Sequence, residues 1–282
     1  MQKLTLPLSI IFSVLIVLGA VAYRSGLEAP LTGSFLSAAG DESNVFWPEW
    51  GNLGKKLVDS GAIDPNKFES VYASRGGLSE GEKKLLYGDN NGKLVVNGEN
   101  AGFVLNLLWA FGLANKNPIL EEGPMMDTRY GGAGNFASTG GWTLAKGDAM
   151  EYYSKILLVV LTPKQQALVE EVSKNIYRPC CNNSTYFPDC NHGMAMLGFL
   201  ELLAAQGASE EEMYRAAFQA NSLWFPDTYA TIAEYLKSKG IAWENVSPKE
   251  ILGPAFSSYS GFSRILAEFT PPEGTGGASC GV

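Results

Sequence analysis

The stretch HGMAMLGFLELLAA, residues 192–205, decides how the rest of the chain must be arranged. Its side chains are apolar on nearly every face of a helix, and Glu201 is the charged exception. A helix that is apolar all round is buried, whereas a surface helix carries a single apolar stripe. We therefore predict a central helix enclosed by others, in which Gly193 and Gly198 permit close packing.

Helix starts recur on both sides of this stretch. In each, a Ser or Thr is followed three residues later by Glu or Gln, so that side chains can satisfy amides that a helix start leaves unpaired. At two of these starts a proline follows the cap, where its fixed backbone angle suits the first helical turn. The pairs are Ser79 with Glu82, Thr162 with Gln165, Ser209 with Glu212 and Ser247 with Glu250, and the prolines are Pro163 and Pro248.

These signals predict a mainly α fold, a multi-helix globular domain with a minor β-hairpin. The hairpin is expected around residues 92–98, which contain the stretch KLVVNG. The helices are expected near residues 47–60, 65–74, 79–87, 100–114, 147–161, 163–177, 192–206, 210–222, 228–239 and 248–252.

Composition limits the possible partners. The chain has 282 residues, of which 46% are hydrophobic and 18% charged, so it can bury a sizeable core. Its formal net charge is -8, and its 21 Lys and Arg residues form no basic run. A nucleic-acid partner would require a clustered positive face. We therefore expect no nucleic-acid partner.

The N-terminal residues form a segment typical of membrane targeting. Residues 4–23 are uncharged, and residues 8–22 form an apolar run. Two interpretations of residues 1–23 stay open: a single transmembrane anchor crossing about 30 Å of hydrocarbon, or a signal peptide with a small-residue cleavage pattern ending at Ala22. Either predicts an extracytoplasmic domain, periplasmic or at the cell surface. It is membrane-anchored in the first case and secreted in the second.

The remaining chain divides into three parts. Residues 24–44 are rich in Gly, Ser, Ala and Pro without apolar periodicity, which is typical of a flexible tether. A helical globular domain is expected over residues 45–270, followed by a Gly-rich tail, residues 271–282, that carries Cys280. Within the domain, residues 130–141 lack periodicity and are predicted to form an ordered loop or a cover.

The residues suited to chemistry are concentrated in the segment CCNNSTYFPDCNH, residues 180–192. Thiolates and imidazole are the ligands of zinc and copper(I), and larger thiolate sets hold iron-sulfur clusters. Cys280 is a further candidate that could complete a four-ligand shell. The segment contributes three of the four cysteines and the only histidine, which are Cys180, Cys181, Cys190 and His192.

We expect these residues to bind a copper or zinc ion. If Asp189 caps the following helix, Cys190 and His192 lie in its first turn, where the positive end of the helix dipole stabilises a thiolate. Met194 and Met196 are better explained as core residues than as ligands. An iron-sulfur cluster becomes the better interpretation if Cys280 joins the other three cysteines.

Two disulfide bridges are the main alternative to a metal. Cys180 or Cys181 would pair with Cys190, and the other would pair with Cys280. Adjacent cysteines rarely both form structural bridges, however, and this alternative gives His192 no role. The missing ligands exclude c-type haem attachment, a Rieske centre and blue copper.

Three functions therefore stay open. The first is a membrane-tethered extracytoplasmic metal-binding protein that handles metal or transfers electrons. The second is a disulfide-stapled structural or interaction domain without metal. The third is a metal-dependent enzyme, in which an open coordination position performs the chemistry.

Overall fold

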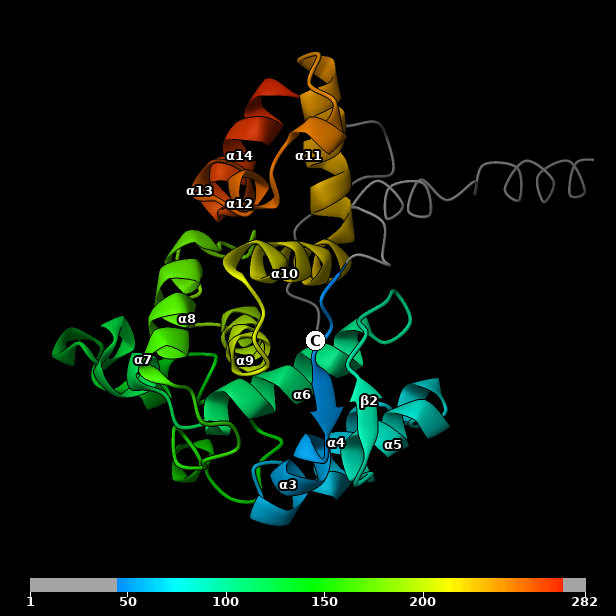
Figure 1. Ribbon diagram of the computed structural model, residues 1–282, viewed down its shortest axis with the longest axis vertical. Helices are drawn as coiled ribbons and strands as arrows, with labels where there is room; N and C mark the ends of the chain where they lie inside the picture. The colour runs from blue at the N-terminus through cyan, green and yellow to red at the C-terminus, as the bar shows by residue number, and fades with distance from the viewer. Residues whose placement is uncertain (1–44, 271–282) are drawn as a thin grey trace, which may run out of the picture.

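The computed structural model describes residues 45–270, which form twelve α-helices and one two-stranded sheet (Figure 1). The predictions for residues 1–44 and 271–282, namely the anchor or signal peptide, the tether and the tail, lie outside the described residues. The elements are β1 Glu49–Gly51, α3 Leu53–Ser60, α4 Pro65–Val71, α5 Glu80–Tyr87, β2 Asn91–Lys93, α6 Ala101–Ala114, α7 Pro118–Glu122, α8 Pro163–Asn175, α9 Asn191–Ala205, α10 Glu210–Trp224, α11 Pro226–Ser238, α12 Pro248–Ile251, α13 Pro254–Ser257 and α14 Tyr259–Glu268.

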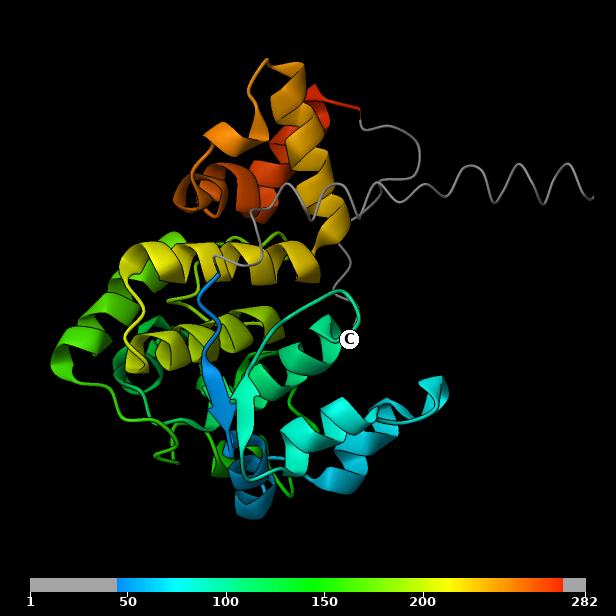
Figure 2. The same cartoon turned by 45° about the vertical axis from the view of Figure 1, so that its right-hand side comes forward.

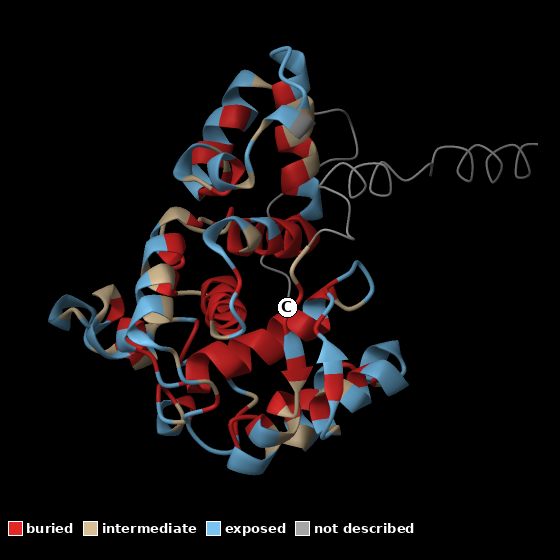
Figure 3. Ribbon diagram, in the orientation of Figure 1, coloured by how far each residue is buried: buried red, intermediate tan, exposed pale blue. Residues whose placement is uncertain are grey.

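Helices α6 and α9 lie against each other at the centre of the molecule (Figure 1). Every residue of α6 except Gly102 is buried, and so is every residue of α9 except Ala205, as the concentration of buried residues in Figure 3 illustrates. The predicted central helix is thus confirmed. Helices α8 and α10 pack on α9, and α3 packs on α6. Figure 2 shows α11 to α14 grouped on the far side of α10.

The predicted helix starts are confirmed in detail. Ser79, Thr162 and Ser209 form complete capping boxes with the Glu or Gln three residues later. Ser247 caps α12 by accepting a hydrogen bond from the backbone amide of Glu250. Pro163 and Pro248 are the first residues of α8 and α12, where the missing amide costs nothing.

The expected hairpin at residues 92–98 is wrong, although a small sheet is present. Strand β2 pairs in antiparallel register with β1, placing Glu49 opposite Lys93 and Gly51 opposite Asn91. The Asn91 side chain strengthens this pairing, because its Nδ2 donates to the Gly51 carbonyl at 2.7 Å. The first helix accordingly begins at Leu53, since the chain before it is part of the sheet.

The expected helix at residues 147–161 is also wrong. Only a 3₁₀ turn forms there, Ala149–Glu151, and Ser154 has a left-handed backbone with φ of 54°. The amides that a helix would use bind elsewhere. The Ser154 and Ile156 amides donate to carbonyls at the C-terminal end of α6. The Asn115 side chain accepts from the amides of Leu158 and Val159. Conversely, α7, α13 and α14 form where the sequence predicts no helix.

Two glycines allow α6 and α9 to touch. A Cβ on Gly112 would lie 2.2 Å from the Met194 carbonyl oxygen, and one on Gly198 would lie 2.8 Å from the Gly112 Cα. Both clashes are with backbone, which cannot rotate away. The expectation that Gly198 permits close packing is confirmed, and Gly112 is its partner.

We expect Gly198→Ala to lower the free energy of unfolding by about 1–3 kcal/mol, because the helices must separate to admit the methyl group. Gly102→Ala is the matched control in the partner helix α6, where a Cβ meets nothing within 4 Å. It should be neutral or stabilising by up to about 1 kcal/mol, since alanine favours helix. Urea denaturation measures both, and equal effects would contradict the close contact.

Glu201 is the charged side chain of α9 and is completely buried. Asn115 Nδ2 donates to its Oε2 at 2.6 Å, and Asn117 Nδ2 donates to its Oε1 at 2.7 Å. Backbone amides donate to the Oδ1 atoms of both asparagines, which fixes their amide groups in this orientation. Burial raises the pKa of Glu201 to about 8, although the two asparagine hydrogen bonds oppose the shift.

This raised pKa makes stability depend on pH. Between pH 4.5 and about 8 the folded protein keeps a proton that the unfolded chain has lost, so the stabilisation present below pH 4.5 is lost as pH rises through 8. We expect the free energy of unfolding to fall by a few kcal/mol over this interval, and Glu201→Gln to remove most of the fall. Urea denaturation across pH tests this. Glu121→Gln, which alters a partly exposed carboxylate, should leave the slope unchanged.

Candidate metal centre

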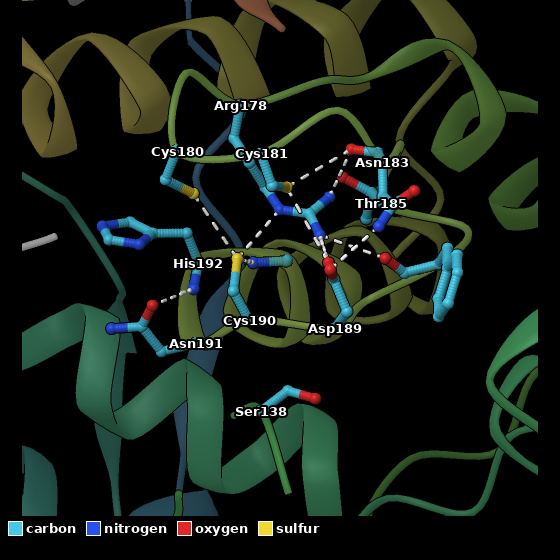
Figure 4. Close-up of polar contacts among 12 residues, drawn as sticks. Ser138, Arg178, Cys180, Cys181, Asn183, Thr185, Asp189, Cys190, Asn191 and His192 are labelled. Carbon is cyan, nitrogen blue, oxygen red and sulfur yellow. Dashed lines mark hydrogen bonds and ion pairs between the residues drawn. The ribbon is translucent and has the colours of Figure 1, made fainter. Parts of the chain in front are cut away.

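The cysteine-rich segment forms the loop between α8 and α9 and ends at the N-terminus of α9 (Figure 4). Cys190 is the N-cap of this helix, and its Sγ accepts from the Gly193 amide at 3.4 Å. Asp189 therefore does not cap the helix, contrary to the sequence-based expectation. Cys190 nevertheless lies at the helix start, where free amides and the helix dipole stabilise a thiolate.

Asp189 instead binds Arg178, a residue that the sequence analysis missed. The Arg178 side chain is 1% exposed and forms an ion pair with Asp189 at 2.5 Å. Its Nε donates to Cys190 Sγ at 3.0 Å, and its two terminal nitrogens donate to the carbonyls of Asn183 and Phe187. The guanidinium thus ties both ends of the loop to the start of α9 (Figure 4).

Gly193 makes room for this arginine. A Cβ at Gly193 would lie 2.5 Å from the Arg178 Cζ atom. The expectation that Gly193 permits close packing is therefore confirmed, but its neighbour is a side chain of the loop and not another helix.

Three of the five predicted ligands converge. The Sγ atoms of Cys180 and Cys190 are 3.5 Å apart. A ring nitrogen of His192 completes a group whose ligand atoms all lie within 4.8 Å of one another. Such a cluster is compatible with a bound metal ion. None of the three cysteines in the loop forms a disulfide.

The His192 ring is held in place by aromatic packing. Its centroid lies 4.4 Å from that of Phe225 and 6.0 Å from that of Trp224, at the end of α10. The residue is 3% exposed, and its Nδ1 has no hydrogen-bond partner. A buried nitrogen without a partner is costly unless something binds it.

Cys181 belongs to a second group, with Asp189 and Cys190, whose ligand atoms also lie within 4.8 Å of one another. Its Sγ is directed to Asp189 Oδ1 and to the Asn183 carbonyl, both at 3.8 Å. Arg178 already pairs with the Asp189 carboxylate and donates to Cys190, so it contacts two of the three members of this group, but only Cys190 in the group of Cys180, Cys190 and His192. The group around Cys180 and His192 is therefore the better metal site.

The surrounding charges and hydrogen bonds favour negative charge on the sulfur of Cys190. Hydrogen bonds from the Cys180 and Cys181 thiols, together with the charge of Arg178, hold the pKa of Cys190 well below its usual range despite burial. Contacts with Cys181 and Cys190, together with burial, raise the pKa of Cys180. These shifts favour the thiolate form at Cys190 and the protonated thiol at Cys180, which faces it.

Cys280 lies outside the described residues. Met194 and Met196 are buried in the hydrophobic core. The loop at residues 130–141 does cover the site segment. The Ser138 amide donates to the Asp189 carbonyl, and Tyr130 and Phe136 pack against Phe187.

Comparisons of the chain with protein-family models, with curated proteins and with solved structures find no match. Within residues 45–270, none of the helices is both long and apolar enough to cross a membrane.

The sequence did contain a signal for Arg178. Between Lys174 and Glu201, Arg178 and Asp189 are the two formally charged side chains, and they carry opposite charges. Two such charges in a loop that precedes a buried helix are expected to pair, because an unpaired buried charge is strongly unfavourable.

We expect Arg178→Lys to destabilise the protein by about 3–5 kcal/mol, because lysine cannot satisfy the carboxylate, the sulfur and two carbonyls at once. It should also raise the pKa of Cys190. Urea denaturation measures the first effect, and ultraviolet absorbance of the thiolate during a pH titration measures the second. Arg129→Lys alters an exposed ion pair with Asp127 and should change stability by under about 1 kcal/mol. Equal effects would contradict the role of Arg178.

Proposed function

We propose that this protein binds one copper(I) or zinc ion through Cys180, Cys190 and His192, and that it handles metal or transfers electrons on the extracytoplasmic side of a membrane. The observation that carries the proposal is the convergence of two sulfurs and a buried imidazole, all within 4.8 Å of one another. The unpartnered His192 Nδ1 adds support, because imidazole nitrogen is a good ligand for both ions.

The sulfur separation favours a metal over a bridge. Two sulfurs each about 2.3 Å from a tetrahedral zinc ion are about 3.8 Å apart, whereas a disulfide bond is about 2.05 Å long. The observed 3.5 Å lies closer to the metal geometry. An iron-sulfur cluster is less favoured, since it would need Cys181 and Cys280 to join.

A metal-dependent enzyme is the second candidate. Three protein ligands are the usual number for catalytic zinc, which keeps a fourth position for water or substrate. A zinc form in which the fourth ligand is exchangeable water would favour it, and a fourth protein sulfur would oppose it.

The membrane location rests on the sequence. Residues 1–23 supply the uncharged apolar segment, either as an anchor or as a signal peptide that leaves a secreted protein. The net charge of -8 and the absence of a basic run in the sequence argue against a nucleic-acid partner.

Metal analysis of the full chain, purified without oxygen, tests the proposal together with thiol counting. We expect one ion per chain in the wild type. Cys190→Ser should lose it, because the variant removes the thiolate at the centre of the group. Met196→Leu should keep it, since this thioether is buried in the core. Cys181→Ser should also keep it, as its sulfur is directed to Asp189 and Asn183.

The other outcomes are informative. Equal loss from Cys190→Ser and Met196→Leu would indicate a copper site that uses the thioether. Loss from Cys181→Ser would make Cys181 a fourth ligand. Two disulfides and no metal in the wild type would overturn the proposal in favour of a stapled structural or interaction domain.

A further inference from the structure

Three donors converge on the Cys190 sulfur. The Arg178 Nε lies 3.0 Å from it and the Gly193 amide 3.4 Å, while the Cys180 thiol faces it at 3.5 Å. Arg178 cannot move away easily, because its other nitrogens bind Asp189 and two backbone carbonyls. Fixed N–H donors and a guanidinium charge at these distances stabilise negative charge on the sulfur, and negative charge makes a cysteine sulfur nucleophilic.

The Cys180 sulfur lies close enough to the Cys190 sulfur to form a disulfide after a small movement. Closing the 3.5 Å gap between Cys180 and Cys190 to a bond of about 2.05 Å requires a shift of about 1.5 Å. The loop that carries Cys180 is held at its base through Arg178, and Cys180 itself is half-buried. Cys181 is less well placed, since its sulfur is also directed to Asp189 Oδ1 and the Asn183 carbonyl, each at 3.8 Å.

We propose that Cys190 and Cys180 form a peroxide-reactive pair, in which the Cys190 thiolate attacks a small hydroperoxide and Cys180 then closes a disulfide. In the first step the sulfur bonds to the nearer peroxide oxygen, the O–O bond breaks, and hydroxide leaves, giving a sulfenic acid on Cys190. In the second step the Cys180 sulfur attacks the Cys190 sulfur, and the thiol proton leaves with the sulfenic oxygen as water. Both cysteines are oxidised together by two electrons, and the peroxide is reduced.

The surroundings select a small oxidant. Cys190 is only partly exposed, and the Arg178 side chain and the Cys180 sulfur both contact its Sγ, so a small hydroperoxide has easier access to it than a peptide or glutathione disulfide. Hydrogen peroxide is comparable in size to two water molecules.

The reaction with peroxide needs no metal, but peroxide and a metal ion compete for the same two sulfur atoms. The competition rests on the proposed function: oxidation consumes two of the three proposed ligands and would release the ion. A bound ion would in turn slow oxidation, because it occupies the electron pair of the Cys190 sulfur.

The test uses the full chain, made metal-free with a chelator under anaerobic conditions and treated with one equivalent of hydrogen peroxide. We expect mass spectrometry to find a Cys180–Cys190 disulfide in the wild type and in the matched control Cys181→Ser. Cys180→Ser should stop at a sulfenic acid on Cys190, which dimedone traps. Cys190→Ser should lose thiol more slowly, by on the order of tenfold. Circular dichroism checks that each variant is folded.

Several results would overturn the inference. Cys190→Ser reacting at the wild-type rate would show that Cys190 is not the nucleophile. A wild-type bond from Cys190 to Cys181 or Cys280 would show that Cys180 does not close the disulfide. Faster oxidation by oxidised glutathione than by peroxide would exclude a small hydroperoxide as the oxidant. Because the protein is metal-free, these outcomes stand apart from failure of metal binding, which the metal analysis detects.

Discussion

At Gly112 and Gly198 the backbones of α6 and α9 are in direct contact, and the positions of the other helices and of the connecting segments depend on this contact. Two helices that meet so closely must both be buried, so their sequences are apolar on nearly every face. The remaining helices then pack around the pair, and the connecting segments carry the polar chemistry. Cys190 and His192 gain a fixed position because they lie at the start of a helix that is buried on nearly every face, while Cys180 and Arg178 come from the loop that precedes it.

The two ends of α9 have opposite effects on a negative charge. At its N-terminus, the free amides and Arg178 stabilise the Cys190 thiolate. Glu201 lies in the last turns, where the helix dipole disfavours an anion, and it is buried as well. Burial raises its pKa to about 8. The asparagines that bind Glu201 also organise the segment after α6, so one protonated carboxyl connects the end of α9 to a stretch that the sequence suggested would be helical.

The elements predicted well are those whose signals are local. Capping boxes and apolar periodicity depend on residues within a few positions, and they located the starts of α5, α8 and α10 within one residue. The failures involve partners distant in the sequence. β2 pairs with β1 about forty residues earlier, and the amides of Ser154 and Ile156 bind carbonyls at the end of α6. For the site, the cysteine and histidine cluster was visible as composition, but the role of Arg178 was not, because its partners span the loop from Asn183 to Cys190.

The distance between the Cys180 and Cys190 sulfurs explains how one cluster supports both proposals. At 3.5 Å the sulfurs are too far apart for a covalent bond and close to the separation that a shared ion imposes. The thiolate on Cys190 is required in both cases, since it is both the metal ligand and the nucleophile. Metal binding removes the proton from Cys180, whereas oxidation removes that proton and two electrons. The two outcomes therefore exclude each other. Metal and peroxide compete for the Cys190 sulfur, whose negative charge Arg178 stabilises from a fixed position.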